Sequence, residues 1–193
     1  MNSLHQERKR GDIFVVSAPS GAGKSTLCMK VLETFPDISF SVSHTTRPPR
    51  LGEQHGVDYY FISVDEFRER IKNNLWAEWA EVHGNYYGTS CEEIEDNLNH
   101  GRHLLLDIDV QGAEQIMRAF PEAVTIFVMP PSIEILEQRL RKRGTDSDDT
   151  IAKRLENAAG EIARKDLYQH VIVNDNLEQA QKDFLEIFSI TLK

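Results

Sequence analysis

Residues 18–26 read Ala-Pro-Ser-Gly-Ala-Gly-Lys-Ser-Thr, between a short apolar run and an amphipathic stretch that starts at Lys24. They match the pattern G-x-x-x-x-G-K-[ST] in its required place between a strand and a helix, with Ala18 at the first glycine position. Gly21 and Gly23 leave the backbone open enough for successive N–H groups to point at phosphate oxygens. A turn that only links a strand to a helix is the alternative, and the ordered combination of strand, loop, Lys-Ser pair and helix argues against it.

The side chains of this loop predict a nucleotide site. Lys24 is placed to reach the β- and γ-phosphates of a nucleotide, and the hydroxyl of Ser25 is placed to ligate Mg²⁺. The start of the following helix adds the positive end of its dipole. We therefore expect a phosphotransferase that uses Mg²⁺ with ATP. The predicted ATP-binding residues are Ala18, Pro19, Ser20, Gly21, Ala22, Gly23, Lys24, Ser25 and Thr26.

Buried apolar runs alternate with amphipathic stretches along much of the chain, a pattern typical of a parallel sheet covered by helices. We expect strands at 12–17, 38–43, 103–109, 124–129 and 170–174. We expect helices at 24–35, 112–120, 132–143 and 150–165, and a closing helix after the last strand. The predicted fold class is therefore α/β.

Two segments break this rhythm and indicate insertions. Short two-sided strands are expected at 58–62 and 75–82, followed by a turn-rich segment GNYYGT. Ser-x-x-Glu capping boxes at residues 63 and 90 predict the starts of two helices there, and Gly101 is expected to end the second. The helices joined by the polar loop TDSDD indicate a second, mobile insertion. The predicted division is a core of 1–42, 93–132 and 166–193, an insertion of 43–92 and a helical lid of 133–165.

Composition limits the partners that we expect. A net charge of −9 argues against binding nucleic acid or an anionic membrane surface, which both need a broad basic face. Cys28 and Cys91 are too far apart to form a metal-binding pair, and they favour a reducing, cytoplasmic setting. The apolar run near the N-terminus is too short to cross a membrane. We expect small-molecule partners, and the sequence leaves the oligomeric state open.

Two carboxylates follow an apolar strand. Asp107 and Asp109 are two residues apart, so on a strand they would share a face. Ligands of open α/β sheets bind at the carboxyl ends of the strands, where P-loop proteins hold Mg²⁺. We therefore assign Asp107 to the metal side. Solvated loop acids or helix caps are the alternative, which stays open for Asp109.

Arg47 and Arg50 flank two prolines that stiffen the backbone between them. Two guanidinium groups held apart in this way suit a phosphate monoester. Taken alone, two loop arginines more often form a solvated surface.

The segments SVSHTTRPPRLGE, GVDYYF, EWAEVHGNYYGTS, LLLDIDVQG, PPSIEILEQRLRKRGTD, KRLENA and VIVND resemble guanylate kinase over nearly the whole chain. The resemblance implies the P-loop nucleoside-monophosphate kinase fold, with a parallel core, a mixed α/β GMP-binding insertion and a helical lid. It implies transfer of the ATP γ-phosphoryl group to GMP, and to dGMP as well, in purine nucleotide metabolism. Ala18 replaces the usual first glycine of the family loop, a substitution typical of bacterial members, and Thr89 keeps the hydroxyl of the serine that some members have.

The same resemblance implies roles for individual residues. Those expected to hold the GMP phosphate are Arg47, Arg50, Tyr59 and Tyr87. Those expected to read guanine are Ser43, Glu78 and Thr89, with Asp109 assisting. The lid arginines expected to close on the ATP phosphates are Arg139, Arg143 and Arg154, which act in catalysis with Lys24 and Arg47.

The acceptor in such a reaction is already an oxyanion, so we expect no strong general base. His44, His55 and His83 are accordingly interpreted as surface or loop histidines. Positioning and charge neutralisation should carry the catalysis. A phosphopeptide-binding module without catalytic activity is the alternative from another class, and the intact Lys24 and Ser25 argue against it. A related kinase for ribose phosphates is the alternative enzyme, and the guanine-reading residues argue against that.

Overall fold

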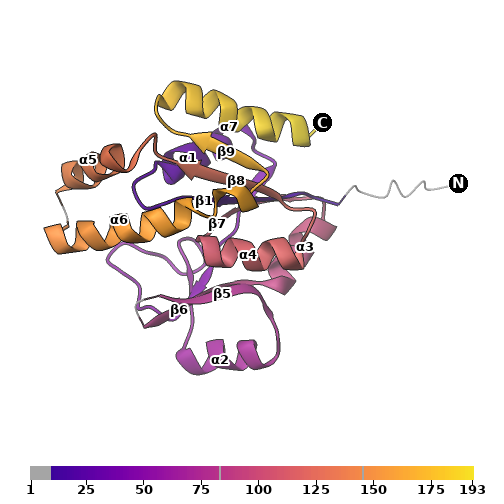
Figure 1. Cartoon of the computed structure of the whole chain (residues 1–193). Helices are drawn as coiled ribbons and strands as arrows, with labels where there is room; N and C mark the ends of the chain where they lie inside the picture. The colour runs from indigo at the N-terminus through magenta and orange to yellow at the C-terminus, as the bar shows by residue number, and fades with distance from the viewer. Residues whose placement is uncertain (1–9, 83, 145) are drawn as a thin grey trace, which may run out of the picture.

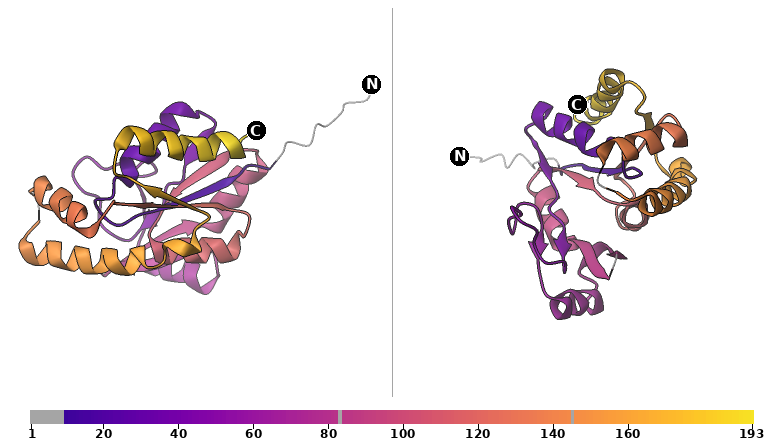
Figure 2. Two further views of the ribbon diagram at one scale, coloured as in Figure 1. Left: turned by 45° about the horizontal axis from the view of Figure 1, so that its top comes forward. Right: turned by 90° about the vertical axis from the view of Figure 1, so that its left-hand side faces the viewer.

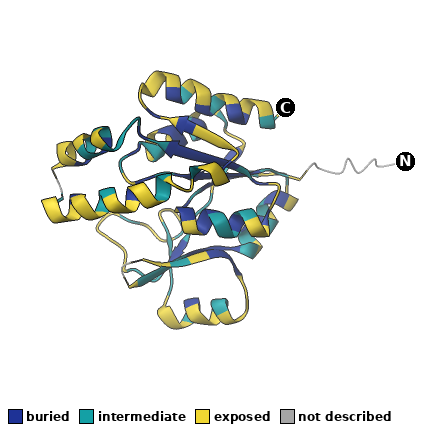
Figure 3. Cartoon of the chain, viewed as in Figure 1, coloured by how far each residue is buried: buried dark blue, intermediate teal, exposed yellow. Residues whose placement is uncertain are grey.

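The computed structural model describes residues 10–82, 84–144 and 146–193 of the chain. Five strands form a central parallel sheet in the order β2-β7-β1-β8-β9. They are β1 (Ile13–Ser17), β2 (Ile38–Phe40), β7 (His103–Asp107), β8 (Val124–Met129) and β9 (His170–Val173). All five residues of β1 are buried, as expected for the central strand of a sheet covered on both faces (Figure 3).

Helices cover both faces of this sheet (Figures 1 and 2). One face carries α1 (Lys24–Thr34) and α7 (Leu177–Thr191). The other carries α3 (Cys91–Asn99) and α4 (Val110–Ala119). Successive side chains of β1 alternate between the two faces, so that Phe14 packs under α1 and α7 while Val15 packs under α3 and α4.

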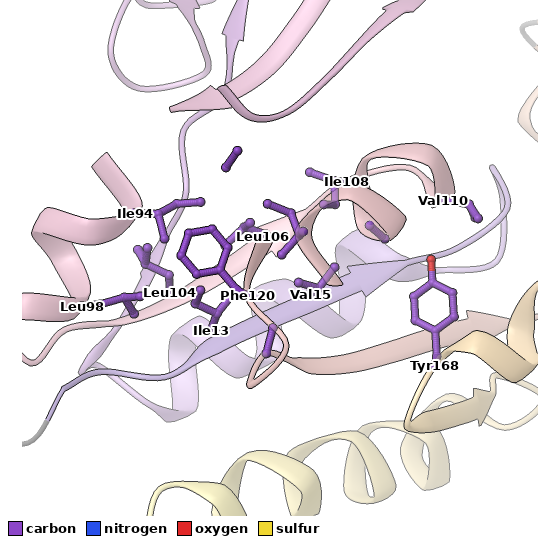
Figure 4. Packing of buried hydrophobic residues seen from close by; sticks show 14 of the residues in the cluster. Ile13, Val15, Ile94, Leu98, Leu104, Leu106, Ile108, Val110, Phe120 and Tyr168 are labelled. Atoms are coloured by element: carbon purple, nitrogen blue, oxygen red, sulfur yellow. The ribbon is translucent and has the colours of Figure 1, made fainter. Parts of the chain in front are cut away.

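The apolar layer under α3 and α4 reaches the carboxyl ends of the strands (Figure 4). Ile108 and Val110 lie there, directly after β7, and both are buried. Each buried aliphatic side chain of this kind contributes roughly 1.5–3 kcal/mol of transfer free energy. The polar residues at these strand ends are therefore carried on a well-packed base.

A second, four-stranded sheet has the order β4-β3-β6-β5 and lies beside the core, with α2 (Val64–Lys72) below it in Figure 1. Its strands are β3 (His44–Thr45), β4 (Tyr60–Phe61), β5 (Trp76–Val82) and β6 (Asn85–Ser90). Phe67 of α2 stacks on Trp76 and Tyr86 with ring centroids 4.3 and 5.3 Å apart, which gives this part an aromatic core of its own.

Two further helices, α5 (Ile133–Arg143) and α6 (Asp148–Ile162), extend from the core beside the carboxyl ends of the strands (Figure 1). Four buried residues hold the pair together: Leu136, Leu140, Ile151 and Ala158. A short 3₁₀ turn, η1 (Lys165–Leu167), leads from α6 to β9.

The structure corrects three details of the predicted elements. The segment GNYYGT forms most of strand β6, antiparallel to β5, because Tyr86 and Tyr87 pack on their neighbours and outweigh the turn preference of glycine and asparagine. The strand predicted at 103–109 ends at Asp107, and the next helix starts at Val110, two residues earlier than predicted. The strands predicted at 38–43 and 58–62 are shorter, at three and two residues.

Candidate active site

The loop 18–26 leaves the first turn of α1 open to an anion. Gly23 stands at the N-cap in the left-handed region with φ 98°, and no side chain caps the helix. Every other described α-helix has a Ser, Asp or Asn side chain at its N-cap, which accepts a backbone N–H bond. Uncapped N–H groups at a helix start bind phosphate well. Ser25 and Thr26 are exposed beside them.

The glycines of the loop also allow close packing. A Cβ on Gly23 would lie 2.2 Å from Nδ2 of Asn174, which donates a 2.8 Å hydrogen bond to the carbonyl of Ala22. A Cβ on Gly21, whose φ is 99°, would lie 3.0 Å from Leu136 of α5. The loop is therefore held in shape by the residue after β9 and by the helix pair.

Lys24 forms an ion pair with Asp107 at the end of β7, and its ammonium donates a 3.3 Å hydrogen bond to the carbonyl of Ile108. Both charged side chains are partly exposed, at 18% and 22%. The structure thus brings the P-loop lysine and the strand-end carboxylate into contact.

Two of the three predicted lid arginines reach the P-loop region. Arg154 donates a 2.9 Å hydrogen bond to the hydroxyl of Ser20, and its guanidinium also lies 3.4 Å from a carboxylate oxygen of Asp146. Arg139 donates a 2.8 Å hydrogen bond to the backbone carbonyl of Asn174. Arg143 is exposed in the last turn of α5.

A cavity of about 300 Å³ lies between the two sheets. Its lining residues include six that the sequence predicted: Ser43, Tyr59, Glu78, Tyr87, Asp107 and Asp109. Ala80 and Val82 of β5 and Ile108 add an apolar side. Asp107 both lines this cavity and pairs with Lys24, so the cavity borders the partner of the phosphate-loop lysine.

Glu78 is the buried acid of this cavity, with 5% of its surface exposed. One carboxylate oxygen accepts a 2.6 Å hydrogen bond from the hydroxyl of Thr89, which lies 3.4 Å from the hydroxyl of Ser43. Burial raises the pKa of Glu78 from 4.5 to about 7; the Thr89 hydrogen bond lowers it and the charge of Asp109 raises it further. The three residues predicted to read a base therefore lie together.

Asp109 is the N-cap of α4, and its carboxylate accepts a 2.7 Å hydrogen bond from the backbone of Gly112. The helix-cap alternative is therefore correct for this residue, although it also lines the cavity. The longer predicted strand would have placed Asp107 and Asp109 on one face. Because β7 ends at Asp107, the two residues do not share the face of a strand.

Arg47 is held by a partner that the sequence analysis missed. Its two terminal nitrogens donate to the two carboxylate oxygens of Glu53 at 3.0 and 2.8 Å, and Glu53 also accepts the backbone N–H of Arg50 at 2.7 Å. The guanidinium lies 5.5 Å from the ring centroid of Tyr59, whose ring centroid is 6.0 Å from that of Tyr87. The Glu53 carboxylate thus occupies both donors of the guanidinium fork, the bidentate geometry in which arginine also binds phosphate. Arg50 is exposed.

The histidines differ from their predicted placement. His44 is buried, not superficial: it stacks on Tyr60 at 4.7 Å and meets the edge of Trp76 at 5.0 Å. Burial lowers its pKa to about 4, with Arg70 as the next cause, so it is neutral at pH 7. His55 is exposed, and His83 lies outside the described residues.

Asn174 and Glu53 contact predicted site residues, and the sequence did not single them out. Asn174 follows β9 at the carboxyl edge of the sheet, so the rule that placed Asp107 could have identified it. Glu53 stands six residues after Arg47 in an irregular loop, where no periodicity predicts contact.

The residues present suit Mg²⁺ held between the protein and a nucleotide. No group of three or more His, Cys, Asp or Glu side chains that could hold a metal occurs within residues 10–82, 84–144 and 146–193. Mg²⁺ usually keeps several waters and binds through one or two protein oxygens plus substrate phosphates. Ser25 and Asp107 provide such oxygens next to the phosphate loop.

The guanylate kinase family model matches residues 10–190. The chain belongs to the guanylate kinase family. It is 49% identical to the guanylate kinase of Geobacter metallireducens over 180 residues, which cover 93% of this chain and 89% of that protein. It is also 49% identical to the guanylate kinase of Fusobacterium nucleatum, over 95% and 98% of the two chains.

A crystal structure of guanylate kinase from Anaplasma phagocytophilum superposes with a TM-score of 0.74 at 39% identity, over 95% of this chain and 87% of that one. This guanylate kinase fold is the predicted one, a parallel core sheet flanked by helices. Among the described helices, none is long and apolar enough to cross a membrane.

Proposed function

We propose that this chain transfers the γ-phosphoryl group of ATP to GMP, giving ADP and GDP. One observation carries the proposal: a single cavity is lined both by the buried Glu78, which accepts a hydrogen bond from the Thr89 hydroxyl, and by Asp107, the partner of the P-loop lysine. The group proposed to read the base, Glu78, and the partner of the P-loop lysine, Asp107, thus line the same cavity. The same contacts would accept dGMP, since they involve the base and the phosphate.

Glu78 supports the choice of guanine. Guanine presents adjacent N1–H and N2–H donors, and one carboxylate can accept both. Adenine presents an acceptor at N1, which would leave a buried carboxylate facing a lone pair. Sites that leave buried polar groups unpaired reject the wrong substrate by factors of up to ~10⁴. The hydroxyls of Ser43 and Thr89 are placed to donate to the remaining acceptors of the base.

The donor and acceptor phosphates are bound by separate groups. The open helix start at residues 18–26 takes the ATP phosphates, and Lys24 exchanges Asp107 for the phosphate that is transferred. Arg47 and Arg50 hold the GMP phosphate, which takes the place of the Glu53 carboxylate on the Arg47 fork. Tyr59 and Tyr87 complete that side of the cavity.

Ser25 and Asp107 would hold Mg²⁺ together with the nucleotide phosphates, and the ion would neutralise charge on the transferred group. The rest of the chemistry is positioning. Arg154 and Arg139 already lie against the P-loop and Asn174, and on closure they add positive charge near the donor, joined by Arg143. No protein base is needed, because the attacking atom is a phosphate oxyanion.

We infer that three parts carry out this work: a core of 1–42, 93–132 and 166–193, a GMP-binding insertion of 43–92 and a lid of 133–165. Separate buried clusters in the core and in the lid support this division, as does the separate sheet of the insertion. Closure of the insertion and lid would exclude water and suppress hydrolysis of ATP. Two free cysteines suit a reducing cytoplasmic setting.

The test is the formation of ADP from Mg²⁺-ATP with GMP, dGMP, AMP, UMP, CMP or a ribose phosphate supplied in turn. We expect strong turnover with GMP and dGMP and little with the others. Glu78→Gln should lower the preference for GMP over AMP by more than tenfold, a factor of the size that about 1.4 kcal/mol provides. Equal use of GMP and AMP by the parent protein, or an unchanged preference in the variant, would contradict the proposed role of Glu78.

A further inference from the structure

Helix α4 contacts β5 through a side-chain pairing that none of the roles assigned so far includes. The carboxamide of Gln115 accepts a 3.1 Å hydrogen bond from the backbone N–H of Trp79 and donates a 2.9 Å hydrogen bond to the backbone carbonyl of the same residue. The two bonds fix the orientation of the amide, because only one of its ends can donate.

This pairing covers a free strand edge. β5 is the terminal strand of its sheet, with β6 on its other side. A terminal strand presents unpaired N–H and C=O groups. Gln115 satisfies both groups of Trp79 as the next strand would, so that β5 is fastened to a helix of the core.

The residue before Trp79 is Glu78, and its carboxylate meets the same helix one turn earlier. A Cβ on Gly112 would lie 2.7 Å from Oε2 of Glu78. Gly112 and Gln115 are three residues apart, which places them on one face of α4. Two neighbouring positions of β5 thus contact two neighbouring positions of α4.

Helix α4 is itself fixed to the core. Ala113 and Ile116 are fully buried in the layer beneath it, and Val110 at its start belongs to the same layer (Figure 4). The hydrogen bonds of Gln115 therefore fix the backbone of β5, which carries Glu78, relative to the well-packed helix α4.

We propose that Gln115 is a positioning residue for base selectivity: its carboxamide fixes the Trp79 peptide on α4, and this sets where the Glu78 carboxylate meets guanine, across the space that Gly112 leaves free. The proposal rests on the proposed role of Glu78 as the guanine reader. It links helix α4 of the core to strand β5, which carries the acceptor-binding Glu78.

The experiment compares GMP with inosine monophosphate, which keeps the N1–H of guanine and lacks its 2-amino group. A correctly placed Glu78 accepts two bonds from guanine and one from hypoxanthine. Misplacement should therefore lower the ratio of kcat/KM for GMP to that for inosine monophosphate, whereas general weakening of the fold would leave this ratio unchanged.

Gln115→Met keeps a side chain of similar length and removes both hydrogen bonds to Trp79. We expect KM for GMP to rise about tenfold and the GMP preference to fall several-fold, as is usual for lost polar contacts. KM for ATP should change by less than about twofold, since no contact to the P-loop is lost. Gln179→Met is the matched control, because Gln179 is an exposed helical glutamine on α7 that bonds Asp183 far from the cavity.

Gly112→Ala tests the other half of the contact without touching Gln115. The new methyl group meets the far end of a flexible side chain, so the protein should fold and the carboxylate should move. We expect the same loss of GMP preference. Gly160→Ala in α6 is its matched control, because a Cβ there meets no atom within 4 Å.

Glu78→Gln, measured in parallel, separates this inference from the proposed function. If Glu78→Gln leaves the preference for GMP over inosine monophosphate unchanged, the proposed role of Glu78 is wrong and the inference is wrong with it. If Glu78→Gln lowers the preference while Gln115→Met lowers only the melting temperature, the inference alone is overturned. If Gln115→Met does not fold, Gln115→Glu takes its place, because it keeps the acceptor and loses the donor. The inference is then tested by the same ratio of kcat/KM for GMP to that for inosine monophosphate.

Discussion

Replacing Glu78 with glutamine should change how the stability of the free protein depends on pH. The carboxyl group is buried, and its pKa is raised from 4.5 to about 7, chiefly because burial disfavours the ionised form. In the unfolded chain the group ionises near its ordinary value. Between pH 4.5 and 7 the unfolded chain therefore releases this proton while the folded protein retains it, and rising pH favours unfolding.

The size of the effect follows from the shift. A shift from 4.5 to about 7 corresponds to about 3 kcal/mol. Between pH 5 and pH 8 the parent should lose about 2–3 kcal/mol of unfolding free energy through this group alone. Glutamine has no proton to release, and its carbonyl can still accept the hydrogen bond of Thr89.

Urea unfolding of parent and Glu78→Gln at pH 5 and pH 8, without nucleotide, measures this difference. The free energy of unfolding of the variant relative to the parent should rise by about 2–3 kcal/mol from the lower to the higher pH. Other titrating groups cancel, since both proteins share them. A relative stability that changes by less than about 0.5 kcal/mol, an ordinary surface effect, would show that the carboxyl is not desolvated as we describe.

Two further predictions concern the phosphate loop. Lys24→Ala should lower kcat by a factor of about 10² or more. The dissociation constant of GMP, measured by calorimetry, should stay nearly unchanged, because Lys24 lies on the donor side of the site. Unaltered turnover would refute the assignment of Lys24. Asn174→Ala removes the bond to the carbonyl of Ala22, and we expect a loss of about 1–3 kcal/mol in urea unfolding together with a raised KM for ATP. A normal KM for ATP would show that the loop holds its shape without Asn174.

The phosphate loop and the parallel core were predictable because local signals determine them. Gly21, Gly23, Lys24 and Ser25 stand at fixed spacing after a largely apolar strand, as expected for a parallel strand that is buried on both faces. The capping residues Ser63 and Ser90 were predictable for the same reason, since a cap bonds only three residues away.

Local signals failed where distant packing decides the structure. The segment that contains Tyr86 and Tyr87 has turn-forming neighbours, yet it forms a strand because Phe67 and β5 pack on it. His44 looks like a loop histidine in the sequence and is buried between aromatic rings that arrive from β4 and β5.

By itself, the sequence determined the class of fold, and it predicted the phosphate-binding loop and, through its resemblance to a family, the residues of the acceptor site. Only the tertiary structure decided how these residues are held. The bidentate pair of Arg47 with Glu53, the bond from Asn174 to the phosphate loop and the seat of Glu78 against α4 each join segments whose contact no local pattern encodes. The physical reason is that spacing along the chain sets backbone conformation over a few residues, whereas burial and side-chain pairing depend on which distant elements share a core.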